Sequence, residues 1–167
     1  MKKLTLLAVL FLTICSSTKA QTKDQLIENF KTILVESLTD FKNIQGEIVE
    51  NDAQGKTAYY ACKQTMGSTL EAICLNSNDN TSYFSAKYEY AKTDELLKAT
   101  EILPGVLDVV NAMVQSGNYK GRDYTNSNNV GVTEVKDLNG NYILEIETGA
   151  DNAYLRITIF GKSWGKK

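Results

Sequence analysis

The spacing of apolar residues alternates between a helical and a strand period, and this alternation limits the folds open to the chain. Residues 23–41 carry apolar side chains every three or four positions, which predicts an amphipathic helix. Thr22 and Gln25 form a T-x-x-Q capping box at its start. Four strand-like runs follow, separated by turn-rich segments: Ile44–Glu50, Thr57–Thr65, Leu70–Asn76 and Ser82–Ala91.

The second half of the chain repeats this order. Another helical stripe begins at Thr93, a plausible cap, and Gly117 is a typical helix stop. Pro104 lies inside the stripe, and we expect a kink or break there because proline cannot donate a backbone hydrogen bond. Asn139-Gly140 is a hairpin signal between two of the last four strand-like runs. These runs are Tyr119–Thr125, Val130–Lys136, Tyr142–Thr148 and Ala153–Gly161.

The element order predicts an α+β fold, because each half has one apolar helix face and one apolar sheet face that must cover each other. We expect a tandem αβ4–αβ4 repeat with half-repeats at about 21–91 and 92–167. Residues 21–167 would form a single domain, with an antiparallel sheet and helices packed on one of its faces. This order is similar to that of small secreted β-lactamase inhibitor proteins. The resemblance covers element order and no specific residue, and it implies protein binding through a concave sheet.

The first twenty residues are typical of a signal peptide. Lys2 and Lys3 precede an apolar run, Leu4–Ile14, that is too short to span a membrane. We expect cleavage after Ala20 and export from a bacterial cell, to the periplasm or the medium. The less favoured alternative is a lipoprotein lipidated at Cys15, because a lipobox needs a small residue at the position of Ile14.

Removal of the signal peptide would leave two cysteines, Cys62 and Cys74. A hairpin centred on Ser68 would place them opposite each other on neighbouring antiparallel strands, within disulfide range. We therefore expect a structural disulfide, the usual state of an isolated pair in an oxidising compartment. Two unpaired thiols are the alternative. A redox or zinc site is disfavoured because the chain has no C-x-x-C pair and no histidine.

Composition disfavours most catalytic and metal chemistry. A chain without histidine lacks the commonest general base and the commonest transition-metal ligand, so we predict a protein that is not an enzyme and has no cofactor or metal. Glu145 and Glu147 share one face of a predicted strand, and we interpret that face as exposed to solvent. Clustered basic residues typical of nucleic-acid binding are missing, and no second apolar run reaches membrane-spanning length.

Tyrosines crowd the first group of strand-like runs. Alternation assigns Phe84, Ala86, Tyr88 and Tyr90 to one face, which we expect to be the core. Tyr60 and Tyr83 are the better candidates for an exposed binding face.

We therefore predict an exported, non-catalytic binding or interaction protein. Its partner would be another envelope or secreted protein, or a peptide. The alternatives are an envelope structural protein or lipoprotein, and a hydrolase that uses carboxylates.

Overall fold

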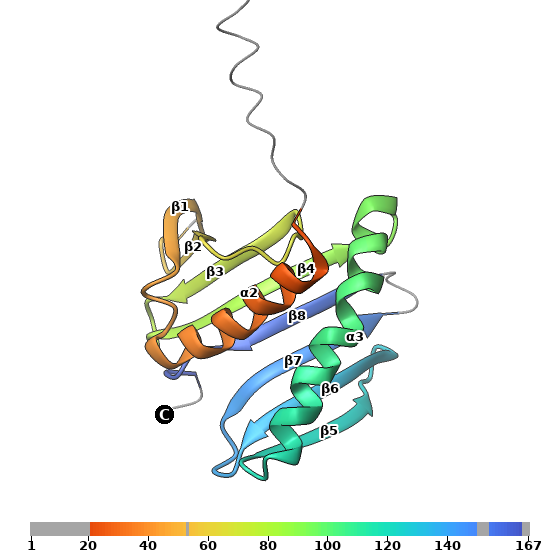
Figure 1. The fold of residues 1–167 in the computed structure, drawn as a ribbon. Coiled ribbons are helices and arrows are strands. Elements are labelled where there is room, and N and C mark those ends of the chain that lie inside the picture. Colours follow the sequence, from red (N-terminus) through yellow and green to blue (C-terminus); the bar gives the residue numbers. More distant parts are fainter. Residues whose placement is uncertain (1–20, 53, 150–153, 165–167) are drawn as a thin grey trace, which may run out of the picture.

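The protein has an α+β fold in which two helices pack against a single antiparallel sheet of eight strands (Figure 1). A computed structural model describes residues 21–52, 54–149 and 154–164. The predicted signal peptide, its cleavage position after Ala20 and Cys15 lie outside the described residues.

The first helix, α2 (Lys23–Glu36), begins where the capping box predicted. Thr22 is the N-cap, and its hydroxyl oxygen accepts a hydrogen bond from the backbone N–H of Gln25 at 3.3 Å. The helix is shorter than predicted, because it tightens into the 3₁₀ turn η1 (Ser37–Thr39) and the chain then reverses. Asp40 and Phe41 have φ values of 55° and 63°, and this reversal carries the Phe41 ring into the core.

The second helix, α3 (Thr93–Gln115), continues through Pro104 without a break. The expected break does not occur because Pro104 lies on the exposed side of the helix, where water can satisfy the carbonyl left without a donor. Thr93 is the first helical residue and not the cap; Lys92 occupies that position. None of the helices within the described part of the chain is long and apolar enough to cross a membrane.

The eight strands lie close to their predicted positions. The spatial order of the sheet is β1-β2-β3-β4-β8-β7-β6-β5, so the two groups of four strands meet at its centre, where β4 pairs with β8. Every neighbouring pair is antiparallel. The bounds are β1 (Gln45–Asn51), β2 (Thr57–Cys62), β3 (Leu70–Asn76), β4 (Thr81–Glu89), β5 (Tyr119–Thr125), β6 (Val130–Asp137), β7 (Tyr142–Gly149) and β8 (Tyr154–Phe160).

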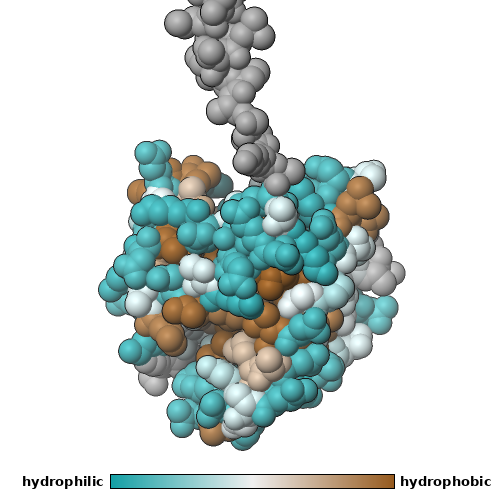
Figure 2. All heavy atoms as spheres, in the orientation of Figure 1, coloured by the Kyte–Doolittle hydropathy of each residue, from teal (hydrophilic) through white to brown (hydrophobic). Residues whose placement is uncertain are grey.

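Strict alternation on the central strands separates a core face from an open face. Phe84, Ala86 and Tyr88 of β4 are fully buried against the helices, and Tyr90 packs beside them, as predicted. Leu155, Ile157 and Ile159 of β8 also point into this core. The intervening residues of both strands point to the side of the sheet away from the helices. Figure 2 shows the helix side of the molecule, where apolar surface gathers between α2 and α3.

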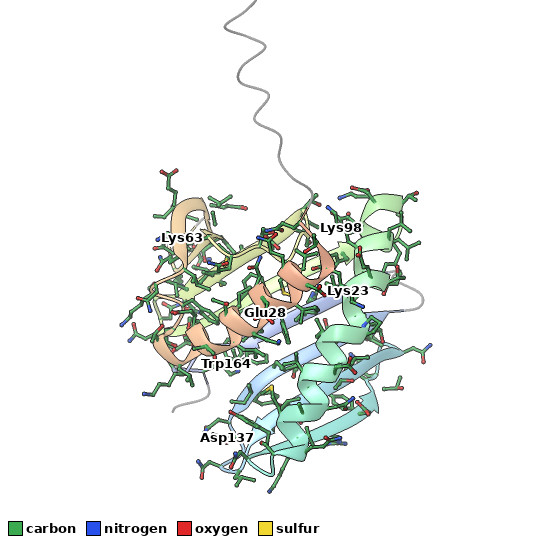
Figure 3. The ribbon with its side chains drawn as sticks, viewed as in Figure 1. Lys23, Glu28, Lys63, Lys98, Asp137 and Trp164 are labelled. Carbon is green, nitrogen blue, oxygen red and sulfur yellow. The ribbon has the colours of Figure 1, made fainter. Side chains whose placement is uncertain are left out.

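The two helices approach most closely at a glycine. A Cβ atom added to Gly105 of α3 would lie 2.7 Å from Cδ1 and 2.9 Å from Cγ1 of Ile27 on α2. The missing side chain therefore lets Ile27 pack directly on the backbone of α3. Nearby, Lys98 of α3 donates a hydrogen bond of 3.0 Å to the carbonyl of Gly67, in the loop between β2 and β3 (Figure 3).

Candidate functional site: a groove on the open face of the sheet

The open face of the sheet contains a groove of about 770 Å³. Its floor is formed by β1 to β4, β7 and β8, and Trp164 stands beyond the end of β8 (Figure 3). This volume is within the usual range of ligand pockets, roughly 300–1,000 Å³. Side chains of neighbouring strands line up across the groove in rows, because paired residues of antiparallel strands point to the same face.

The first row is aromatic. Glu50 lies opposite Tyr59, Tyr59 opposite Cys74, Cys74 opposite Tyr83, and Tyr83 opposite Phe160. Tyr83 and Cys74 share a side-chain hydrogen bond. Burial, with this bond and the nearby groups, raises the pKa of the Tyr83 hydroxyl well above its ordinary value, so it stays protonated at neutral pH.

Trp164 extends the aromatic row beyond the sheet. Its ring meets Tyr83 edge-on, with centroids 5.7 Å apart, and lies 4.8 Å from the centroid of Phe160. Tyr142 packs edge-on against the Phe160 ring at 5.5 Å. These four rings, from Tyr83, Tyr142, Phe160 and Trp164, are called the aromatic wall below.

Asp40, in the reversal after α2, holds the segment that carries Trp164. Its Oδ1 atom accepts hydrogen bonds from the backbone N–H of Ser163 at 3.0 Å, from the Ser163 hydroxyl at 2.7 Å and from the Ser82 hydroxyl at 2.8 Å. Burial opposes the charge of Asp40, but these bonds outweigh it and lower the pKa of the carboxyl. Gly161 is required beside them, because a Cβ atom there would collide with the Ser82 hydroxyl.

The row farthest from the aromatic wall is mainly charged. Leu70 lies opposite Lys87, Lys87 opposite Arg156, and Arg156 opposite Glu147. Arg156 and Glu147 form an ion pair of 2.9 Å, and Lys87 lies 3.4 Å from a carboxylate oxygen of Glu89. Both cations of the groove therefore already have an acidic neighbour.

The middle row contains an unusual carboxylate, Glu145. It lies between Thr158 of β8 and Glu134 of β6, and Ser85 lies opposite Thr158 on β4. Burial raises the pKa of Glu145, and the nearby charges of Glu134 and Glu147 raise it further. The sequence alternation placed Glu145 correctly on the open face, but the interpretation of a solvent-exposed strand face missed the groove around it.

The predicted disulfide is corrected by the observed strand register. Cys74 lies opposite Tyr59 and not opposite Cys62, and both cysteines are free thiols. Cys62 packs with the core on the helix side of the sheet, whereas Cys74 lines the groove on the other side. The hairpin is therefore not centred on Ser68 as predicted. Burial raises the pKa of the Cys62 thiol to about 11.

The two predicted binding tyrosines do not share a face. Tyr83 lies in the groove, whereas Tyr60 packs against the core with Cys62 on the helix side. Tyr59, the neighbour of Tyr60, takes its place in the groove. The observed register explains this result: Cys74 lies opposite Tyr59, three residues from the predicted partner Cys62, and a shift by an odd number of residues moves every side chain of a strand to the opposite face.

Sequence reasoning missed Asp40, Phe160 and Trp164 as parts of the site. Phe160 has a local signal, since it continues the outward phase of Arg156 and Thr158. The contacts of Asp40 with Ser163 have no local signal in the sequence, because they join residues 123 positions apart.

The structure contains no cluster of three or more cysteine, aspartate or glutamate side chains that could hold a metal ion, within residues 21–52, 54–149 and 154–164. Comparison of the chain with protein-family models, with curated proteins and with solved structures found no match.

Proposed function

We propose that the protein is an exported, non-catalytic binding protein that holds a peptide, or a segment of another envelope or secreted protein, in the groove. The observation that carries this proposal is the aromatic wall. Three of its rings, from Tyr83, Tyr142 and Trp164, are partly exposed, and Phe160 is buried behind them. Large rings supply contact area at little cost in conformational entropy, which is why they are enriched at binding surfaces. Backbone pairing, the Asp40 hydrogen bonds and ring–ring packing hold them in place before any ligand arrives.

Peptide selection tests this function. A phage-displayed library of random heptapeptides would be selected on immobilised residues 21–167. Ser85→Tyr would fill the groove floor, and Thr32→Tyr, on the exposed side of α2, is the matched control. We expect enriched peptides to bind the wild-type protein and Thr32→Tyr equally, and Ser85→Tyr at least tenfold more weakly.

Trp164 gives a second readout, because it is the only tryptophan in the chain and it stands in the aromatic wall. Peptides that occupy the groove should change its fluorescence. Enriched peptides that bind Ser85→Tyr as tightly as the wild-type protein, or no enrichment over an uncoated surface, would contradict the proposal.

A carboxylate-dependent hydrolase is the second candidate. It is favoured by the position of Glu145 opposite Glu134 and by the raised pKa that burial and these neighbouring charges give it, since a raised pKa is a common property of carboxyl groups that act as general acids. Hydrolysis of glycoside and ester substrates by the wild-type protein, abolished in Glu145→Gln, would support this candidate over simple binding.

Export is part of the proposal and has its own test. Protein recovered from the envelope and medium of expressing bacteria should begin at Gln21. A chain that begins at a lipid-modified Cys15 would instead support the lipoprotein alternative.

We also propose that the chain arose by duplication of a helix followed by four strands. The element order is repeated, and the sheet order is symmetric about the central β4–β8 pair. Gly46 of β1 and Gly121 of β5 occupy similar positions near the starts of the two edge strands. Superposition of residues 21–91 on residues 92–167 with matching helix and strand positions would support a duplication, and different helix placement would argue against it.

A further inference from the structure

We propose that the groove recognises a lysine or arginine side chain of an extended peptide segment, and that Glu145 is the carboxylate that receives its charge. This inference rests on the proposed binding function and specifies the chemistry of the partner.

The first argument is that the side-chain carboxylate of Glu145 forms neither a hydrogen bond nor an ion pair with any residue that the structure describes. The other buried or half-buried carboxylates near it each have a partner. Glu134 is 7% exposed and forms an ion pair of 2.9 Å with Lys136, and Glu147 is paired with Arg156. Glu145 is thus the half-buried acidic group of the groove floor that remains available to a ligand, whereas Glu50, which also lines the groove, is exposed on the edge strand β1.

The second argument is that the cations around Glu145 are engaged elsewhere. Lys136 of β6 lowers the pKa of Glu145 by its charge, but its ammonium pairs with Glu134 and lies 3.9 Å from the centroid of the Tyr142 ring. Arg156 of β8 pairs with Glu147, and Lys87 of β4 lies beside Glu89. On β5, the guanidinium of Arg122 lies 5.0 Å from the centroid of the Tyr124 ring, opposite Glu134.

These ion pairs also indicate which charge the ligand carries. An anion would have to separate Arg156 from Glu147 or Lys87 from Glu89 before it could be bound, and it would face Glu145 at the same time. A cation would supply the counter-charge that Glu145 lacks. A charged hydrogen bond in a partly desolvated groove is also stronger than a neutral one.

The third argument is the distance between Glu145 and the aromatic wall. The row of Ser85, Thr158 and Glu145 lies two residues along the strands from the row of Tyr83 and Phe160, which is about 7 Å. Lysine and arginine carry a charged head on an apolar stem of similar length. Such a side chain can lay its stem along Tyr83, which is partly exposed in the row that contains Phe160, while its head reaches Glu145.

The test uses the heptapeptides selected on the groove. We expect a lysine or arginine in most enriched sequences. Replacing that residue with norleucine, which keeps the stem and removes the charge, should weaken binding roughly tenfold, the effect expected for a charged hydrogen bond. Binding would be measured by the fluorescence of Trp164.

The protein variants are Glu145→Gln and the matched control Glu101→Gln, which lies on the exposed side of α3. Glu145→Gln should weaken the lysine peptide roughly tenfold and leave the norleucine peptide unchanged, whereas Glu101→Gln should affect neither. Affinity of the wild-type protein for the lysine peptide should also rise with pH, because only the deprotonated form of Glu145 carries the required charge. This pH dependence should disappear in Glu145→Gln.

Negative results in these experiments would distinguish the inference of a bound cation from the proposed peptide-binding function. Groove-binding peptides without a basic residue, or equal affinity for the lysine and norleucine forms, would overturn the cation inference and leave the binding function intact. A lysine peptide that binds Glu145→Gln as tightly as the wild-type protein would also overturn it, because the charge would then be received elsewhere. If no peptide distinguishes the wild-type protein from Ser85→Tyr, the binding function itself fails.

Discussion

Asp40 and Ser163 lie 123 positions apart in the chain, yet both the backbone N–H and the hydroxyl of Ser163 donate hydrogen bonds to the same carboxylate oxygen. This contact ties the turn after α2 to the segment after β8. Lys162 reinforces it, because its backbone N–H donates to the carbonyl of Ser37 at 2.8 Å. The contact fixes the position of Trp164 against Tyr83 and Phe160, so a residue on the helix side supports one wall of the groove.

Asp40→Ala should release this segment. We expect a loss of about 2 kcal/mol in the free energy of unfolding, because buried donors lose a charged acceptor, and a red shift of Trp164 fluorescence. The stability and the Trp164 emission of Asp40→Asn should lie between those of the wild-type protein and of Asp40→Ala. Asparagine tolerates the φ of 55° at this position and keeps one acceptor oxygen. Asp108→Ala, on the exposed side of α3, is the control. Unchanged Trp164 emission in Asp40→Ala would show that the wall is held by ring packing alone.

The same hydrogen bonds predict an acid-sensitive fold. They hold the pKa of Asp40 below its ordinary value, so the stability they contribute is present above that ordinary value and is lost as the pH falls through the lowered pKa. Urea unfolding at a series of acidic pH values should show this loss in the wild-type protein. The Asp40→Asn variant should have a weaker pH dependence over the same range, and equal slopes would contradict the assignment.

Ionisation of Glu145 should have the opposite effect on the pH dependence of stability. Its pKa is raised in the folded protein, so the folded state favours the protonated form, and stability falls as the pH rises from the ordinary glutamate pKa through the raised one. Glu145→Gln should therefore be more stable than the wild-type protein at neutral pH by roughly 0.5–1 kcal/mol, because it removes a partly buried charge and its repulsion by like charges on neighbouring positions. The two proteins should converge below the ordinary glutamate pKa of about 4.3. Thermal unfolding at both pH values measures the difference, and a less stable variant at neutral pH would contradict this interpretation.

The contact between Gly105 and Ile27 predicts a size limit at the crossing of the two helices. Gly105→Ala would gain about 1 kcal/mol in helix propensity, but its new Cβ would overlap the end of the Ile27 side chain. We expect a net loss of about 1–3 kcal/mol, typical of overpacking. The double variant Ile27→Ala, Gly105→Ala should destabilise less than the sum of the two single changes in a urea double-mutant cycle. Simple additivity would show that the new methyl group is accommodated without Ile27 moving.

The two cysteines should remain free even in protein prepared under oxidising conditions, because they lie on opposite faces of the sheet. Residues 21–167 should have the mass of two thiols, and both should react with a thiol reagent after denaturation. In the native protein Cys62 should react slowly, because its raised pKa leaves little thiolate at neutral pH. A mass that corresponds to one disulfide would show that the strand register differs from the one described.

The spacing of apolar residues in the sequence is sufficient to predict much of the fold. They predicted both helices and all eight strands, and they assigned the correct faces on β4 and β8, where Tyr83 alternates with Phe84 and Arg156 with Ile157. These properties are local. A side chain in a strand points away from its neighbours whatever the partner strand is, and a capping box needs only a few consecutive residues.

The strand register and the set of side chains that line the groove depend on contacts between distant parts of the chain. The turn at Gly67 and Ser68 could close in more than one register, and packing of Tyr60 and Ile73 against the helices selected the one that opposes Cys74 to Tyr59. The pairing of β4 with β8 brought Phe160 beside Tyr83. Glu145 also lacks an ion pair because the neighbouring cations pair with other carboxylates: Lys136 pairs with Glu134, and Arg156 pairs with Glu147. Such contacts join distant parts of the chain, and their energies depend on the whole packed sheet, so no local pattern in the sequence encodes them.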